Sequence, residues 1–159
     1  PIGWMAQTLE EALAEAQRSA EVTHDHPEGI KGAQAVAAGT FLARAGKSKV
    51  EIRTFLEQTC GYDLTRTLER IRPHCGFDVS CPGAVPEAII AFLEATGFKE
   101  AVRNAVSLGG DADTQASIAG AFAHAFHGEV PVELARAASS ILPWEFIRVL
   151  DRFSERAGR

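Results

Sequence analysis

Three oxygen-bearing side chains stand close together in the segment Gly109-Gly110-Asp111-Ala112-Asp113-Thr114. Small and apolar residues recur at helical spacing both before and after this segment, so we expect it to be a turn between two helices. The two glycines suit the left-handed conformation that ends many helices. Asp111, Asp113 and Thr114 then fall at the start of the next helix, beside backbone N–H groups that lack a helical partner.

These three side chains have two interpretations. As capping residues, they accept backbone hydrogen bonds and complement the positive end of the helix dipole, for about 1 kcal/mol. As metal ligands, two carboxylates and a hydroxyl suit a hard cation such as Mg²⁺ or Mn²⁺. Positions i and i+2 do not face each other on a regular helix, so metal binding requires Asp111 to lie in the non-helical cap. Spacing alone leaves both interpretations open.

The histidines and cysteines give weaker signals. His24 and His26 have a spacing that occurs in metal sites, yet polar capping residues are equally common before a helix. Cys60, Cys75 and Cys81 are odd in number and irregular in spacing, which favours free thiols in a reducing compartment over a disulfide framework. No fourth ligand stands at a spacing typical of zinc. We therefore expect structural thiols and a cytoplasmic protein.

Helix start signals divide the chain into short segments. Thr8 with Glu11, and Ser48 with Glu51, have the spacing of a capping box. Pro27 suits the first turn of a helix that is rich in alanine and glycine and extends to about residue 45.

The second half of the chain follows the same pattern. The segment 74–82 is dense in Pro, Gly, Cys and Ser and is expected to be a surface loop, with helix resuming near residue 85. Pro143 is expected to open the last helix, with Phe146 and Leu150 facing inward. No stretch alternates with period two. The sequence thus predicts an all-α, orthogonal multi-helix bundle of eight or nine short helices, forming one compact domain over residues 1–159.

Composition excludes several classes of protein. Apolar residues make up 46% of the chain and charged residues 23%, which is typical of a globular domain. The formal net charge is −5 and no basic cluster occurs, which argues against a surface for nucleic acid or for an anionic membrane. No stretch approaches the roughly 20 apolar residues that a membrane-spanning helix needs. We expect neither a nucleic-acid nor a membrane partner.

Three motifs resemble a known family and occur in the order in which that family carries them. Residues 23–33 read Thr-His-Asp-His-Pro-Glu-Gly-Ile-Lys-Gly-Ala, and residues 81–88 read Cys-Pro-Gly-Ala-Val-Pro-Glu-Ala. Residues 106–114 read Val-Ser-Leu-Gly-Gly-Asp-Ala-Asp-Thr, with Ile-Ala-Gly at 118–120. Together they resemble the ADP-ribosylglycohydrolases, across essentially the whole chain.

This resemblance implies an activity and a set of site residues. Members of the family hold two Mg²⁺ ions between helices and cleave ADP-ribose from modified side chains or related conjugates. Asp111 and Asp113 would be carboxylate ligands, with Asp113 shared by both ions and Thr114 supplying another oxygen. His24 would lie against the ADP-ribose, and Gly109 and Gly110 are turn residues whose N–H groups could approach it. Metal ions would orient the ribose hydroxyls and a water around an oxocarbenium-like state. The resemblance reverses the balance between capping and metal binding in favour of the metal.

One departure from the family is large. Its members also carry a Thr-Asp-Asp metal motif in an N-terminal half, whereas no Asp-Asp pair occurs in this sequence. The chain is therefore expected to be the C-terminal half of such a hydrolase, with no assignable catalytic residue and with half of the two-metal site. Its expected partners are an ADP-ribosylated protein or ADP-ribose-type small molecule, and either a missing N-terminal half or a second copy of itself. The alternative is a catalytically inactive ADP-ribose-binding or interaction module.

Overall fold

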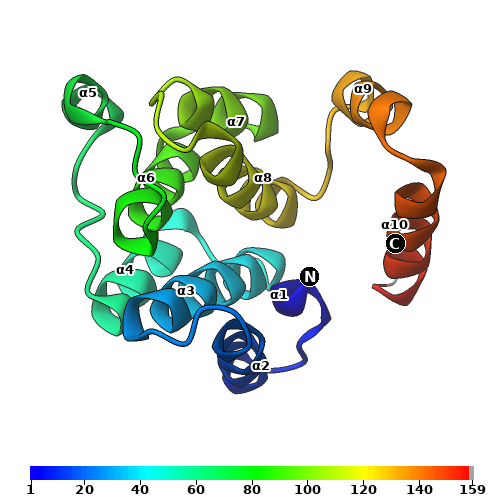
Figure 1. Cartoon of the computed structure of the whole chain (residues 1–159), viewed down its shortest axis with the longest axis horizontal. Coiled ribbons are helices and arrows are strands. Elements are labelled where there is room, and N and C mark those ends of the chain that lie inside the picture. The colour runs from blue at the N-terminus through cyan, green and yellow to red at the C-terminus, as the bar shows by residue number, and fades with distance from the viewer. Residues whose placement is uncertain (158–159) are drawn as a thin grey trace. The chain divides into compact units, whose positions relative to one another are not determined.

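The computed structural model describes residues 1–157, and every regular element among them is a helix (Figure 1). The α-helices are α1 (Ile2–Met5), α2 (Leu9–Glu21), α3 (Pro27–Arg44), α4 (Lys49–Cys60), α5 (Leu68–Ile71), α6 (Cys81–Glu94), α7 (Phe98–Val106), α8 (Ala112–His127), α9 (Val132–Ile141) and α10 (Trp144–Arg156), with the 3-10 turn η1 (Arg72–His74) after α5. The all-α prediction is confirmed. The helix beyond the expected number is α1, which has four residues and therefore shows no periodicity.

The described residues form two compact units, one of residues 1–128 and one that begins at Glu129. The second unit contains α9 and α10, and neither helix has a buried residue. Phe146 and Leu150 are 58% and 51% exposed, so the inward packing expected for them is not found. Two short helices have too little surface to enclose a core of their own. The single domain over 1–159 remains a prediction.

Helix α3 occupies the centre of the first unit and packs against α1, α2, α4, α6 and α8 (Figure 1). Its buried face consists almost entirely of small residues: Gly32, Ala35, Ala37, Ala38, Gly39, Thr40 and Ala43. Small side chains allow neighbouring helices to approach closely, and larger residues from those helices fill the remaining space. Phe122 of α8 and Phe92 of α6 are both fully buried, with ring centroids 5.3 Å apart. This packing holds α3, α6 and α8 against one another.

Side-chain caps define several helix starts. Ser48 and Glu51 form the expected reciprocal capping box at α4. At α2, the Thr8 hydroxyl accepts from the Glu11 N–H at 3.1 Å, but the Glu11 carboxylate accepts from the N–H of Gln7 rather than from that of Thr8. The Glu11 carboxylate thus bonds one residue before the position that a capping box requires.

Helix α6 begins at Cys81, four residues earlier than the sequence predicted. The Ser80 hydroxyl caps it by accepting from the Gly83 N–H at 3.2 Å. Pro82 is tolerated because the first turn of a helix does not use its N–H groups. The composition of 74–82 was therefore misleading, since its last residues are the opening turn of a buried helix. No helix of the described residues is long and apolar enough to cross a membrane.

Candidate functional site

The turn between α7 and α8 has the predicted glycine geometry. Gly109 adopts a left-handed conformation with φ of 74°, and its N–H donates to the Val106 carbonyl at the end of α7. A side chain at Gly110 would lie 3.1 Å from the carbonyl oxygen of Gly76 and 3.2 Å from the Gln115 side-chain nitrogen. The turn is therefore held between the 75–80 loop and the first turn of α8.

The two aspartates lie on either side of the first residue of α8. Asp111 is the cap residue, with φ −73° and ψ 72°, and its side chain makes no capping hydrogen bond. The Asp113 carboxylate accepts from the Thr114 N–H at 3.0 Å. The hydrogen bond with the Asp111 side chain, followed by backbone hydrogen bonds, holds the pKa of Asp113 below its ordinary value. The side chains of Asp111 and Asp113 thus interact, because Asp111 lies outside the regular helix.

One part of the capping interpretation holds, because the Asp113 carboxylate accepts from the backbone N–H of Thr114. The capping interpretation fails for Asp111, whose side chain is directed to another carboxyl group instead of to the backbone. The described residues include no cluster of three His, Cys, Asp or Glu side chains suited to a metal. An octahedral ion held here would need other oxygens, such as the Thr114 hydroxyl or water, to complete its shell.

A cavity of about 610 Å³ lies next to the start of α8. Its wall brings together the three motifs that are far apart in the sequence: His24 from the α2–α3 turn, Cys81 from the start of α6, and Thr114 from the first turn of α8. Most of the remaining wall is apolar and comes from α1, α2 and α3. The arrangement is a largely apolar pocket with a few polar groups at one end, as is usual for small-molecule sites.

Two glycines in the 23–33 motif explain how the cavity wall closes. A Cβ on Gly29 would lie 2.8 Å from the His24 carbonyl oxygen, so only glycine lets the His24 turn fold back onto α3. A Cβ on Gly32 would lie 3.1 Å from the Cys81 sulfur, so a larger residue would separate α3 from the start of α6. The spacing of these glycines therefore positions His24 and Cys81 on one wall.

The predicted site residues fall into two groups. His24 and Thr114 line the cavity, whereas Asp111, Asp113, Gly109 and Gly110 lie in the turn and at the start of α8 and are not part of its wall. The His24 Nδ1 is 2.8 Å from the Thr23 hydroxyl.

Histidine 26 and the cysteines follow the simpler interpretations. His26 caps α3, because its Nδ1 accepts from the Glu28 N–H at 3.2 Å. Cys60, Cys75 and Cys81 are all free thiols.

Sequence reasoning missed five hydroxyl residues of the cavity wall, namely Ser19, Thr23, Thr40, Ser80 and Ser117. Ser117 stands three residues after Thr114 on α8, a spacing that places both on one face of a helix. That spacing was readable in advance. Ser80 was missed because the sequence predicted the start of α6 four residues too late.

Comparison with known families agrees with these positions. The ADP-ribosylglycohydrolase family model matches residues 1–156. The chain belongs to this family. ADP-ribosylglycohydrolases are hydrolases that act on ADP-ribosylated substrates and are in general metal-dependent, so the family confirms the kind of activity expected from the motifs. The match extends over nearly the whole chain and gives no support to the expectation that the chain is only the C-terminal half of such a hydrolase.

Proposed function

We propose that this chain contributes to Mg²⁺-dependent cleavage of a ribosyl bond in an ADP-ribosylated protein or a related ADP-ribose conjugate, with Mn²⁺ as a substitute ion. The observation that carries the proposal is the interaction between the side chains of Asp111 and Asp113, beside a cavity lined by Thr114 and His24. Asp111, Asp113 and Thr114 would hold the cation. When bound, the ion would supply positive charge that orients ribose hydroxyls and a water.

The chain's own groups then bind and orient the substrate. The largely apolar wall of the cavity excludes water from one side of a bound ADP-ribose unit. The His24 imidazole stands on that wall, with its Nδ1 engaged by the Thr23 hydroxyl, so Nε2 is the nitrogen left for a ligand. Asp111 and Asp113 stand at the positive end of the α8 dipole, which attracts a negative charge. Gly110 would bring its backbone N–H close to the same end of the helix, whereas the Gly109 N–H already donates to the Val106 carbonyl.

On this proposal, the remaining groups come from another segment. No Asp-Asp pair occurs in the sequence, and the described residues supply only two carboxylates at the start of α8. We propose that an N-terminal half, or a second copy of this chain, completes the two-ion site and provides the acid or base that acts on the bond. The alternative function, an inactive ADP-ribose-binding module, is favoured by this same lack of a third acidic group.

Calorimetric titration with ADP-ribose, with and without Mg²⁺, tests the proposal. We expect binding that strengthens with Mg²⁺, weakens after chelation, and loses its Mg²⁺ dependence in Asp113→Asn. Glu10→Gln is the matched control, because it removes the same charge from the first turn of α2, away from the cavity wall. Tight binding that ignores Mg²⁺ would instead identify a metal-independent binding module. A strictly monomeric mass by light scattering would exclude completion of the site by a second copy.

A further inference from the structure

A second, smaller cavity lies between the α5–η1 segment and α6, and it shares no wall residue with the first. Its volume is about 280 Å³, and its wall consists of Arg66, Arg70, Ile71, His74, Cys75 and Glu87. Two guanidinium groups, an imidazole and a carboxylate therefore face one small space. The proposed hydrolase chemistry uses none of them.

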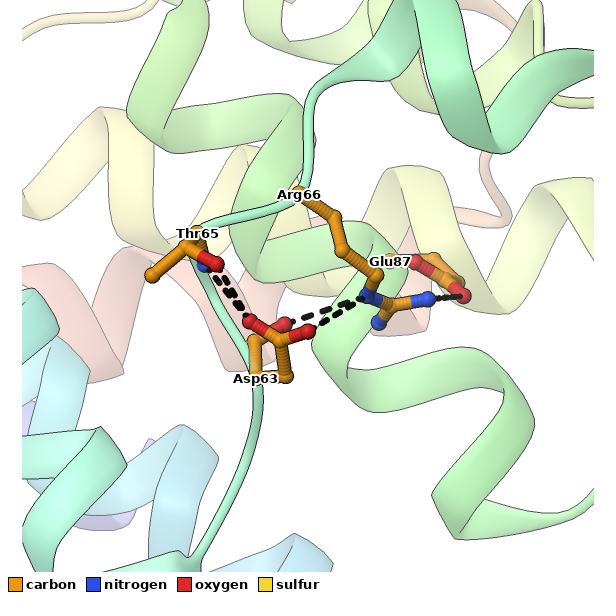
Figure 2. Close-up of polar contacts among 4 residues, drawn as sticks. All are labelled: Asp63, Thr65, Arg66 and Glu87. Atoms are coloured by element: carbon orange, nitrogen blue, oxygen red, sulfur yellow. Dashed lines mark hydrogen bonds and ion pairs between the residues drawn. The ribbon is translucent and has the colours of Figure 1, made fainter.

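Arg66 is held in a fixed orientation at this cavity. Its Nη1 donates to Glu87 Oε1 at 2.9 Å, and its Nε donates to the Asp63 carbonyl at 3.2 Å. Asp63 is itself anchored, because its carboxylate accepts from the hydroxyl and the N–H of Thr65 at 2.6 and 3.1 Å (Figure 2). These Thr65 hydrogen bonds, and secondarily the Arg66 charge, hold the pKa of Asp63 below its ordinary value. The guanidinium is thus positioned before any ligand arrives.

Several hydrogen-bond donors and one buried acceptor around this cavity have no partner. Within the described residues, Arg66 Nη2 and the side chains of Arg70 and His74 have no hydrogen-bond partner. Glu87 Oε2 is buried and also has no partner. A buried carboxylate oxygen without a donor is costly, since it has lost its water without gaining a hydrogen bond. A ligand that suits the cavity must accept hydrogen bonds from the arginines and donate one to Glu87.

We propose that this cavity binds a phosphate group that still carries a proton. The anionic oxygens would accept from Arg66, Arg70 and His74, since guanidinium groups match the geometry of phosphate oxygens. The P–OH group would donate to Glu87 Oε2. Sulfate has the same shape but carries no proton near neutral pH, so it would leave Glu87 unpaired and would be repelled by it. The source is either free hydrogen phosphate or the terminal phosphate of a monoester.

Binding to the whole chain is measured by calorimetry at pH 6, with inorganic phosphate, glycerol phosphate and sulfate as separate titrants. Both phosphates carry a proton at this pH in a substantial fraction of molecules. We expect phosphate to bind at least about tenfold more tightly than sulfate, because only phosphate satisfies the buried acceptor. Binding of inorganic phosphate alone would identify the free ion as the source, and binding of both phosphates would identify the shared group. Equal affinity for sulfate, or no binding by either phosphate, would overturn the proposal.

Variants assign the binding to this cavity. Arg70→Ala should weaken phosphate binding about tenfold or more, and it is safe for folding because Arg70 is exposed. Arg72→Ala is the matched control, since Arg72 lies two residues further on but bonds to the Ser107 hydroxyl outside the cavity wall. Glu87→Gln should abolish the preference for phosphate over sulfate. Unchanged phosphate binding in Arg70→Ala would refute the location even if Glu87→Gln failed to fold.

Discussion

The packing of α3 against α8 makes a sharp prediction about two glycines. A Cβ on Gly39 of α3 would lie 2.0 and 2.3 Å from ring carbons of Phe122 on α8. Phe122 is fully buried and packs on Phe92, so its ring has no free space into which to move. On α8, a Cβ on Gly120 would lie no closer than 3.5 Å to any neighbour, which is ordinary contact.

The two alanine substitutions should therefore have opposite signs. Gly39→Ala gains up to about 1 kcal/mol of helix propensity, but forcing the buried ring aside costs about 1–3 kcal/mol, so we expect a net loss of about 1 kcal/mol. Gly120→Ala meets no clash and should gain about 0.5–1 kcal/mol. Urea unfolding followed by circular dichroism measures both free energies of unfolding.

The double variant Gly39→Ala with Phe122→Leu supplies the control. In the Phe122→Leu background, Gly39→Ala should lower the free energy of unfolding by less than it does when the Phe122 ring is present. A double-mutant cycle measures this difference as a coupling free energy. A Gly39→Ala protein as stable as the parent chain would refute the close approach of α3 and α8. A destabilised Gly120→Ala protein would equally refute the space assigned to that position.

Three further predictions concern α4 and its contacts. Ser48→Ala removes the cap of α4 and should lower the free energy of unfolding by about 1 kcal/mol in thermal or urea unfolding. Hydrogen bonds from Ser48 and then Lys47 lower the pKa of Glu51 from 4.5 to about 2. The contribution of the Glu51 carboxylate to stability is therefore complete above pH 4.5 and is lost as the pH falls toward 2. In acid titration, a Glu51→Gln protein should lose less stability than the parent chain over that interval. Lys49→Met should lower the free energy of unfolding by about 1–3 kcal/mol, because the Lys49 ammonium donates to carbonyls at the end of α6, including that of Phe92 at 3.0 Å. An unchanged midpoint of urea unfolding would contradict this role.

Sequence reasoning recovered most of the helices because caps and periodicity are local signals. Ser48 with Glu51, and Pro27 at the start of α3, were readable from a few neighbouring residues. The start of α6 was missed because Pro82 and Gly83 resemble loop composition, whereas the Ser80 cap and burial against α3 make them helical. The exposure of Phe146 and Leu150 was missed because periodicity shows which side of a helix is apolar but not what covers it.

The candidate site was predictable to a different extent. The left-handed turn at Gly109 followed from glycine geometry, and Asp111 occupies the cap position that an interaction with Asp113 requires. The sequence did not predict that His24 and Thr114 line one cavity, because their positions depend on how closely α3, α6 and α8 approach one another. That approach is set by glycines whose tertiary contacts leave no local pattern in the sequence.

Binding of Mn²⁺ to the Asp111–Asp113 pair is the most direct test of the account. Electron paramagnetic resonance of free Mn²⁺, titrated with the protein at neutral pH, measures the bound fraction. We expect Mn²⁺ to bind, Mg²⁺ to displace it, and either Asp111→Asn or Asp113→Asn to abolish binding, while Glu10→Gln leaves it intact. Binding that survives both aspartate substitutions would contradict the assignment of the metal to the start of α8.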